Sequence, residues 1–486
     1  MFLLKGTRFF IFTCLVMGIV SCQSHKQSVL TKKYAPSQLR ADAVVLKQVV
    51  LKMHPVIGLY ESRVAYEKKF DDFIAALNDS LTEKEFRIRL KLLADGFHCG
   101  HTEIMASRRT YKETGKLKQN YSPFIFLPVG EKVYVLANVN KRQDSVLKKG
   151  AEVLKINGVP ADSMVRYCKR FITSDGFNAS SKEHYVQLGF NAYYLNLFGR
   201  PDTFQVEFKT EAGSRTKQYQ AFKPKSIPPL PLGAKDDSLY TRYKKAAMRF
   251  RYLDKNKTTL VLNVRKFSHR KDAKAYRKIF RSMKKNHTQN LVLDLRNNGG
   301  GSLANSYRLL SYLLREQAPQ TLKTGIKQYP YKKYTHGNVW FKFTKLVYTF
   351  IGVRKTLNDT DYFTYMIKPR KKNHFDGRVL VLINGGSFSA SCLVAAYLQK
   401  DKRAEFVGEE TGGTLEGCNA GITPYYTLPN TGIKARIPAF RIMHDGMEVF
   451  SGRGIMPDYP VKYGIQEILQ RKDLEMMRVG ELLKIQ

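Results

Sequence analysis

Apolar residues recur at helical spacing over residues 38–118. They fall on one face between Ala43 and Leu51, and this run ends at His54-Pro55, where the proline stops a helix. Two further helical patterns cover Ser62 to Leu77 and Thr82 to Ala94. We therefore predict a helical cap at the front of the chain.

Between residues 119 and 224 the pattern becomes β-rich. Asn157-Gly158 follows a strand-like run and is a strong hairpin signal. The sequence from Lys148 to Pro160 also resembles a PDZ signature. This resemblance implies a PDZ-like domain that binds peptide termini by adding a strand to its sheet. A structural spacer is the alternative.

Beyond a proline-rich linker at residues 225–235, strand-like and helical runs alternate within residues 236–475. The strand-like runs are Thr258 to Val264, Asn290 to Leu295, Arg378 to Ile383 and Ala404 to Val407. This alternation predicts a multi-domain α/β protein whose core carries active-site loops at its strand ends. We expect the aromatic, basic stretch from Gln317 to Lys372 to insert near the cleft, as a lid or substrate wall.

Ser389 lies in a glycine- and serine-rich turn, Asn384 to Ser391, between an apolar strand and a helical stretch. Such a turn exposes a side-chain oxygen at the carboxyl end of the strand. It also directs free backbone N–H groups and a helix dipole at the same point. A nucleophile and an oxyanion hole need that environment, although anion binding or helix capping would also explain the turn.

A second turn has the same design. Leu291 to Gly301 is a buried strand that ends in three consecutive glycines, which let backbone amides approach a ligand closely. Taken alone, it would be a strand-end turn with a capping aspartate.

Three segments together resemble the tail-specific (C-terminal processing) protease family, in its tricorn-core-like branch. They are Asp294 to Gly301, Ser387 to Ser391, and Gly452 to Asp458. The resemblance implies a ClpP/crotonase-like α/β serine protease core behind the cap and the PDZ-like domain. It implies that Ser389, the middle serine of Ser-x-Ser-x-Ser, is the nucleophile.

A serine hydroxyl needs a neighbouring base. Thr414 stands where one branch of the family has a lysine, and threonine cannot serve as a base at neutral pH. The tricorn-like branch uses a histidine in a Gly-His-Thr context, which implies His101. His98 is the second candidate, and a structural histidine pair or a metal cluster with Cys99 are the alternatives.

The resemblance also implies an orienting acid and an oxyanion hole. Glu448 is the nearest carboxylate ahead of the Gly452–Asp458 element, although a surface role for Glu448 is the alternative. We expect the backbone N–H groups of Ala390 and Gly300 to hold the oxyanion, and the hydroxyl of Thr102 to lie near His101. Losing one oxyanion donor typically costs about 3 kcal/mol.

Residues 1–22 have the pattern of a secretory signal, with Lys5 and Arg8 ahead of an apolar run that is short for a membrane span. The run ends in Ile19-Val20-Ser21-Cys22, which resembles a bacterial lipobox. Lipidation of Cys22, followed by a polar tether at residues 23–37, would make a membrane-anchored lipoprotein facing the periplasm. A plain signal peptide and an uncleaved anchor are the alternatives.

The net charge is +41, from 82 basic and 41 acidic side chains. It favours anionic lipids, polyanionic glycans or acidic substrates, or else reflects a solvated basic surface. No nucleic-acid-binding module is recognisable, so we expect no nucleic-acid partner. Beyond Cys22, four cysteines remain at irregular spacing, which predicts free thiols rather than a disulfide framework; a bridge from Cys99 to Cys392 or Cys418 is the alternative.

The sequence therefore predicts a membrane-tethered serine endopeptidase that acts on proteins or peptides and needs no cofactor and no metal. Two other functions use the same features. One is a non-catalytic peptide- or envelope-binding protein on the same fold, and the other is a hydrolase of esters or other acyl groups. The sequence predicts no oligomeric state.

Overall fold

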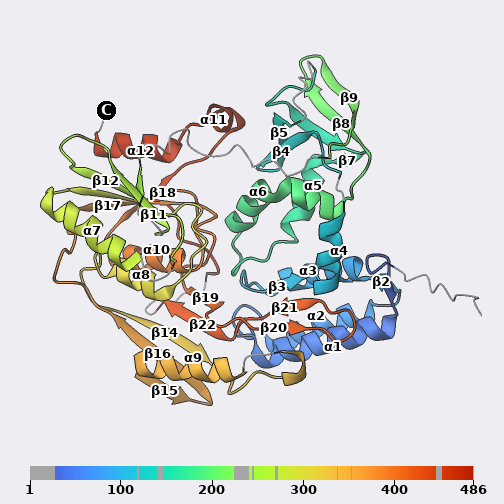
Figure 1. The fold of residues 1–486 in the computed structure, drawn as a ribbon, viewed down its shortest axis with the longest axis horizontal. Coiled ribbons are helices and arrows are strands. Elements are labelled where there is room, and N and C mark those ends of the chain that lie inside the picture. Colours follow the sequence, from blue (N-terminus) through green and yellow to red (C-terminus); the bar gives the residue numbers. More distant parts are fainter. Residues whose placement is uncertain are drawn as a thin grey trace, which may run out of the picture.

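The computed structural model describes residues 28–117, 120–139, 146–223, 240–242, 246–268, 272–335, 338–351, 353–444 and 451–484. The predicted signal sequence with Cys22, the proline-rich linker and Glu448 lie outside these residues. Within them, no helix combines the length and hydropathy that a membrane crossing requires. Figure 1 shows helices at the front of the chain in blue, a sheet domain in green, and a core from yellow to red.

The front of the chain is helical, as its apolar spacing predicts. Thr82 and Glu85 form a capping box at the start of the third helix, in which each side chain accepts a hydrogen bond from the other residue's N–H. The elements are β1 (Lys33–Tyr34), α1 (Pro36–Met53), α2 (Arg63–Ala75), β2 (Leu81–Thr82), α3 (Glu83–Asp95), β3 (Glu103–Met105) and α4 (Arg108–Lys116).

This helical region shares one hydrophobic cluster with the later part of the chain that follows the proline-rich linker. Its buried side chains belong to the same cluster as those of strands β12 (Thr259–Val264), β13 (Asn290–Asp294) and β17 (Arg378–Ile383) of the core. Strand β3 pairs antiparallel with β21 (Lys434–Arg436), which also pairs with β20 (Tyr425–Thr427). Buried Asp42 on α1 accepts hydrogen bonds from the backbone N–H groups of Asn430 and Thr431. The helical region is therefore fastened to the segment of residues 430–436.

The middle of the chain forms a sheet domain with its own hydrophobic cluster. Asn157 and Gly158 have φ values of 48° and 79°, so both central residues of the hairpin turn are left-handed, as a type I′ turn requires. The strand order is β4-β5-β6-β8-β9, with β7 paired to β6. The elements are β4 (Phe124–Val129), β5 (Lys132–Asn138), β6 (Glu152–Ile156), β7 (Val159–Pro160), α5 (Ala161–Lys169), α6 (Ser180–Leu197), β8 (Thr203–Thr210) and β9 (Gly213–Gln220).

A seven-stranded sheet forms the core, in the order β10-β11-β12-β13-β17-β18-β23. The strands from β12 to β23 run parallel, and the four strand-like runs of the sequence occupy β12, β13, β17 and β18. The strands are β10 (Thr241–Arg242), β11 (Met248–Tyr252), β12 (Thr259–Val264), β13 (Asn290–Asp294), β17 (Arg378–Ile383), β18 (Glu405–Gly408) and β23 (Tyr459–Pro460).

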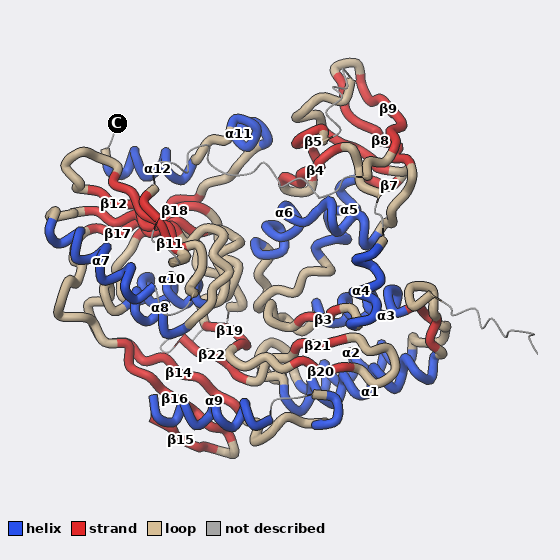
Figure 2. The backbone as a smooth tube through the Cα atoms, viewed as in Figure 1, coloured by secondary structure: helices blue, strands red, loops and turns tan. Residues whose placement is uncertain are grey.

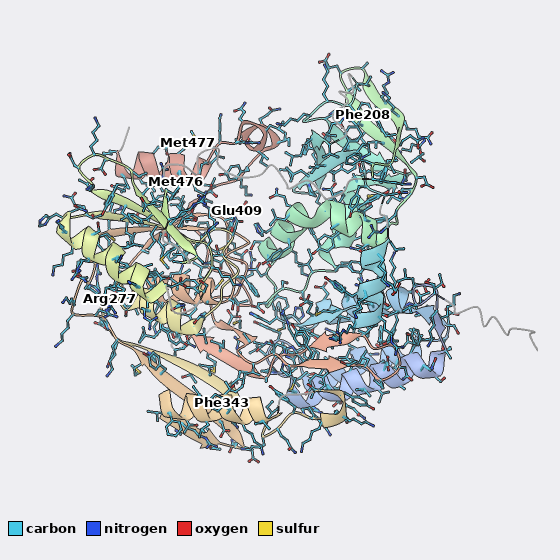
Figure 3. The ribbon with its side chains drawn as sticks, viewed as in Figure 1. Phe208, Arg277, Phe343, Glu409, Met476 and Met477 are labelled. Carbon is cyan, nitrogen blue, oxygen red and sulfur yellow. The ribbon has the colours of Figure 1, made fainter. Side chains whose placement is uncertain are left out.

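Both faces of this sheet are covered, which explains why its strands are continuously apolar. Because side chains alternate along a strand, Leu291 and Leu293 pack on one face and Val292 packs on the other with Val479 of α12. Figure 2 shows the helices on either side of the strands, and Figure 3 places Met476 and Met477 on α12. The helices are α7 (Asp272–Lys285), α8 (Leu303–Leu310), α10 (Ala390–Lys400), α11 (Ile465–Gln470) and α12 (Leu474–Leu483).

A second, five-stranded sheet has the order β15-β16-β14-β22-β19, and three of its strands, β14, β15 and β16, come from the aromatic and basic stretch of residues 317–372. Its helix α9 carries Phe343, which is half exposed (51%) and is labelled in Figure 3. The elements are β14 (Ala318–Thr324), the 3₁₀ turn η1 (Lys332–Tyr334), α9 (Asn338–Ile351), β15 (Val353–Leu357), β16 (Thr360–Ile367), β19 (Gly417–Ala420) and β22 (Phe440–His444).

Candidate active site

Ser389 caps the start of α10 in a backbone conformation that non-glycine residues rarely adopt, with φ 58° and ψ −118°. Such a conformation persists only where the surroundings fix it. Here the two outer serines of the motif provide that support. The Ser387 hydroxyl donates to the Leu295 carbonyl at 2.8 Å, and the Ser391 hydroxyl donates to the Asn298 carbonyl at 2.7 Å. These buried serines hold the turn against the end of β13, while the middle hydroxyl stays accessible.

His101 lies beside this hydroxyl. Its Nε2 atom is 3.2 Å from Ser389 Oγ, although 288 positions separate the two residues in the sequence. The imidazole stacks on the ring of Phe388, with the ring centroids 4.7 Å apart. Sequence reasoning paired these two residues, and the fold brings them together.

Three contacts hold the loop that carries His101. The N–H of Gly100 donates to Asp175 Oδ1 at 2.8 Å, and Arg436 Nε donates to the His101 carbonyl at 3.2 Å. A Cβ at Gly100 would lie 2.7 Å from the Phe388 ring, so only glycine lets the loop approach this closely.

The third contact comes from His54. Its Nδ1 atom accepts the Val56 N–H at 3.1 Å, so its Nε2 donates to Thr102 Oγ1 at 2.7 Å. Burial lowers the pKa of His54 to about 3, which keeps this ring neutral. The Thr102 hydroxyl was expected beside His101, but it is the partner of His54, a structural histidine.

The nearest described carboxylate to the His101 ring is that of Asp175, on the loop between α5 and α6. Asp175 Oδ1 lies 3.9 Å from His101 Nδ1, and the Asp175 side chain is only 3% exposed. His101 Nδ1 and Asp175 Oδ2 are both buried without a hydrogen-bond partner. The sequence analysis missed Asp175, because its local signal is a common Ser-Asp-Gly turn inside the region that resembles a PDZ domain.

His98, the second candidate base, does not reach Ser389. Its Nδ1 lies 3.0 Å from the Gly176 carbonyl, and its Nε2 lies 3.2 Å from Glu61 Oε1. The His98 ring therefore links the loop that carries Asp175 to the segment just ahead of α2. His98, Cys99 and His101 do not form the alternative metal cluster, because the His98 ring is turned toward Glu61.

The expected oxyanion amides lie in the two glycine turns. The N–H of Ala390 is the first of α10, where backbone donors lack intrahelical acceptors and the helix dipole favours negative charge. Gly300 has φ 94°, and a Cβ there would lie 2.8 Å from Ser389 Cβ. Its own N–H donates to Asn298 Oδ1 at 3.0 Å. The Gly300 backbone thus borders Ser389, while the Gly300 N–H already has an acceptor.

Two residues that depart from the family motifs have structural roles. Thr414 is buried and stands where one branch of the family has a lysine. Its hydroxyl donates to the Gly417 carbonyl. Cys392 donates to the Ser387 carbonyl at 2.9 Å and accepts the Gly413 N–H at 3.2 Å. Burial raises the pKa of Cys392 to about 12, so it stays a thiol. Cys99, Cys168, Cys392 and Cys418 are all buried and free, as expected.

Ser389 and His101 open into a cavity of about 1220 Å³. Strands β14 and β16 contribute Leu322 and Phe363 to its wall, so the aromatic and basic stretch does line the cleft. No aspartate or glutamate is among the described residues that line the cavity. The basic side chains that line it are those of Arg308, Lys368, Arg370 and Arg436.

Residues 258–461 match the pattern of peptidase family S41. Mature CPAF is 14% identical to the chain, covers 92% of this chain and 97% of its own, and has a TM-score of 0.64. CPAF complexed with lactacystin is 13% identical to the chain, covers 92% of this chain and 98% of its own, and has a TM-score of 0.64. The photosystem II D1 C-terminal processing protease is 14% identical, with coverages of 90% and 98% and a TM-score of 0.41. Comparison with curated proteins finds no match.

At these identities, the similarity to CPAF is a similarity of fold. The S41 match adds sequence evidence, and it spans the Asp294–Gly301 turn, the Ser387–Ser391 turn and the Gly452–Asp458 element. Residues 258–461 therefore form a peptidase family S41 domain, and this match together with the fold supports a serine-type peptidase.

Proposed function

We propose that the chain is an endopeptidase in which Ser389 attacks the substrate carbonyl and His101 is the general base. The approach of His101 Nε2 to Ser389 Oγ at 3.2 Å carries this proposal. An imidazole at hydrogen-bond distance can take the hydroxyl proton as the C–O bond forms. It then returns that proton to the leaving amine, and water repeats the cycle on the acyl-enzyme.

Asp175 supports the base in this scheme. Its carboxylate faces Nδ1 from 3.9 Å, and apo sites often tighten only when substrate binds. A hydrogen bond from Nδ1–H to Asp175 fixes the tautomer that leaves Nε2 free to accept a proton. The buried negative charge also stabilises the imidazolium that forms. The N–H of Ala390 faces the developing oxyanion, with the positive end of α10 behind it.

Labelling with a fluorophosphonate separates this function from that of a non-catalytic binder. Wild-type protein should react, Ser389→Ala should not, and His101→Ala should react several orders of magnitude more slowly. Ser311→Ala is the matched control, because Ser311 lines the same cavity and donates its hydroxyl to the Arg308 carbonyl at 2.8 Å. A correctly folded wild type that does not react would favour the binder.

Peptide and ester substrates then separate a peptidase from a general acyl hydrolase. The family and the large cleft support a protein or peptide substrate. We expect cleavage within unstructured polypeptides. Activity on small esters with none on peptides would favour the acyl hydrolase.

Membrane tethering is a further part of the proposal, and it rests on the N-terminal sequence up to Cys22. In a bacterial host, wild-type protein should incorporate a labelled fatty acid and sediment with membranes. Cys22→Ser should lose both properties. Exclusion of the wild-type protein from the envelope fraction would refute an anchor that faces the periplasm.

A further inference from the structure

A second group of side chains meets on the side of His101 that faces away from Ser389. His101, Asp175 and Cys418 each offer one ligand atom, and these atoms all lie within 4.8 Å of one another. Because His101 Nε2 faces Ser389, Nδ1 is the nitrogen available to this cluster. Cys418 comes from β19, so three distant segments contribute to one point.

Two atoms of this cluster lack the partner that burial normally demands. His101 Nδ1 and Asp175 Oδ2 are buried and accept or donate no hydrogen bond, and the 3.9 Å between Nδ1 and Asp175 Oδ1 is too long for one. An unsatisfied buried polar atom destabilises the folded state, so such atoms are rare. Unsatisfied lone pairs that converge beside a thiol suit a bound cation.

The donor set matches zinc. Imidazole nitrogen, thiolate sulfur and carboxylate oxygen are the ligands that Zn²⁺ takes, at about 2.0–2.3 Å. Two ligand atoms of one tetrahedral ion are about 3.3–3.8 Å apart at those bond lengths. The separation of 3.9 Å between His101 Nδ1 and Asp175 Oδ1 is close to this ligand–ligand distance. All ligand atoms of the cluster lie within 4.8 Å of one another, so they must approach one another by about 1 Å to bind one ion.

We propose that Zn²⁺ binds reversibly to His101 Nδ1, Asp175 and Cys418, and that it switches the peptidase off. This inhibitory effect rests on the proposed role of His101 as base. As the S–Zn bond forms, the Cys418 thiol loses its proton to solvent. As the N–Zn bond forms at Nδ1, the ring proton resides on Nε2. An imidazole with a proton on Nε2 has no lone pair there to accept the proton of Ser389.

Cobalt titration tests the site without any activity. Ser389→Ala protein is titrated with Co²⁺, whose bond to a thiolate gives a near-ultraviolet charge-transfer band, and Zn²⁺ should displace it. Adding Cys418→Ala should abolish the band and weaken Zn²⁺ binding at least tenfold. Cys168→Ala is the matched control, since Cys168 is also a buried free thiol but belongs to the sheet domain. No band, or a band that survives Cys418→Ala and Cys418→Ser, overturns the site.

The second experiment tests inhibition in otherwise wild-type protein. Zn²⁺ should slow fluorophosphonate labelling at least tenfold, and a chelator should restore the rate. Cys418→Ala should be labelled at the wild-type rate and should need at least tenfold more Zn²⁺ for the same inhibition. If Zn²⁺ binds in the cobalt experiment but labelling is unchanged, inhibition is refuted. If nothing is labelled at all, the peptidase proposal fails while the cobalt result still decides the metal site.

Discussion

At the scale of single residues, a buried carboxylate lies beside the His101 ring. Asp175 combines 3% exposure with a 3.9 Å separation from His101 Nδ1. A negative charge is retained in such a place only when it has a function or a partner. Its Oδ1 accepts the Gly100 N–H and is also the oxygen that lies 3.9 Å from His101 Nδ1, while its Oδ2 is buried without a hydrogen-bond partner.

Asp175→Asn should therefore lower kcat/KM by about 10²–10⁴-fold, since an amide can fix the wrong tautomer of the base. Because Asp175 acts through His101, the pH profile of kcat/KM should also change in shape, and KM should change little. A variant with the wild-type rate and pH profile would show that Asp175 only holds Gly100. Asp175→Glu should recover part of the activity if the charge is what matters.

Gly100 provides a steric test of the same loop. In Gly100→Ala the new Cβ would lie 2.7 Å from the Phe388 ring, so His101 must move away from Ser389. We expect at least a 10²-fold loss of labelling rate, because a displacement near 1 Å costs about that much. Gly115→Ala is the control: Gly115 lies in α4 with nothing within 4 Å of the added Cβ, and should keep full activity. Circular dichroism and the melting temperature report whether each variant is folded.

At the scale of elements, the sequence was most informative where the pattern is local. The strands at 258–264, 290–295 and 378–383 were predictable because both their faces are buried, which makes them continuously apolar. The glycine turn at Ser389 was predictable because it follows such a strand. The pairing of β3 with β21 was not, since it joins segments more than 300 residues apart by backbone hydrogen bonds.

The same reason explains why Asp175 was missed and Thr102 was misassigned. Both roles depend on which loops meet in space, and no local spacing encodes that meeting. Ser387 and Ser391 illustrate the converse. Their motif was recognisable, but only the contacts with Leu295 and Asn298 show that the outer serines support the turn instead of reacting.

At the scale of the whole molecule, buried neutral histidines make the fold sensitive to acid. Burial lowers the pKa of His54 to about 3 and that of His444 to about 4, compared with 6.5 in the unfolded chain. The unfolded state therefore binds more protons below pH 6.5, and the stability that these neutral rings provide is lost as pH falls from 6.5 toward 4. Each contributes up to about 1.4 kcal/mol per pH unit in that window. Urea unfolding at pH 7, 5.5 and 4.5 should show this decline in the free energy of unfolding. In His54→Gln the free energy of unfolding should fall less steeply with pH.

The charge of the whole molecule bears on substrate choice. With a net charge of +41 and a catalytic cavity that has no acidic side chain among its described lining residues, acidic peptides should be steered into the cleft. We expect kcat/KM for an acidic peptide to exceed that for its amide analogue, and the difference to shrink between 20 and about 300 mM salt as charges are screened. Equal values at low salt would show that the basic surface plays no part in selection.

The antiparallel pairing of β3 and β21 has a consequence for biosynthesis. A polypeptide still emerging from the ribosome contains the imidazole long before the alcohol, and β21, which pairs with the strand that follows the imidazole, is made after both. Hydrolytic power would thus appear only after translation has nearly finished, so an incomplete product would be unable to digest its neighbours in the cell.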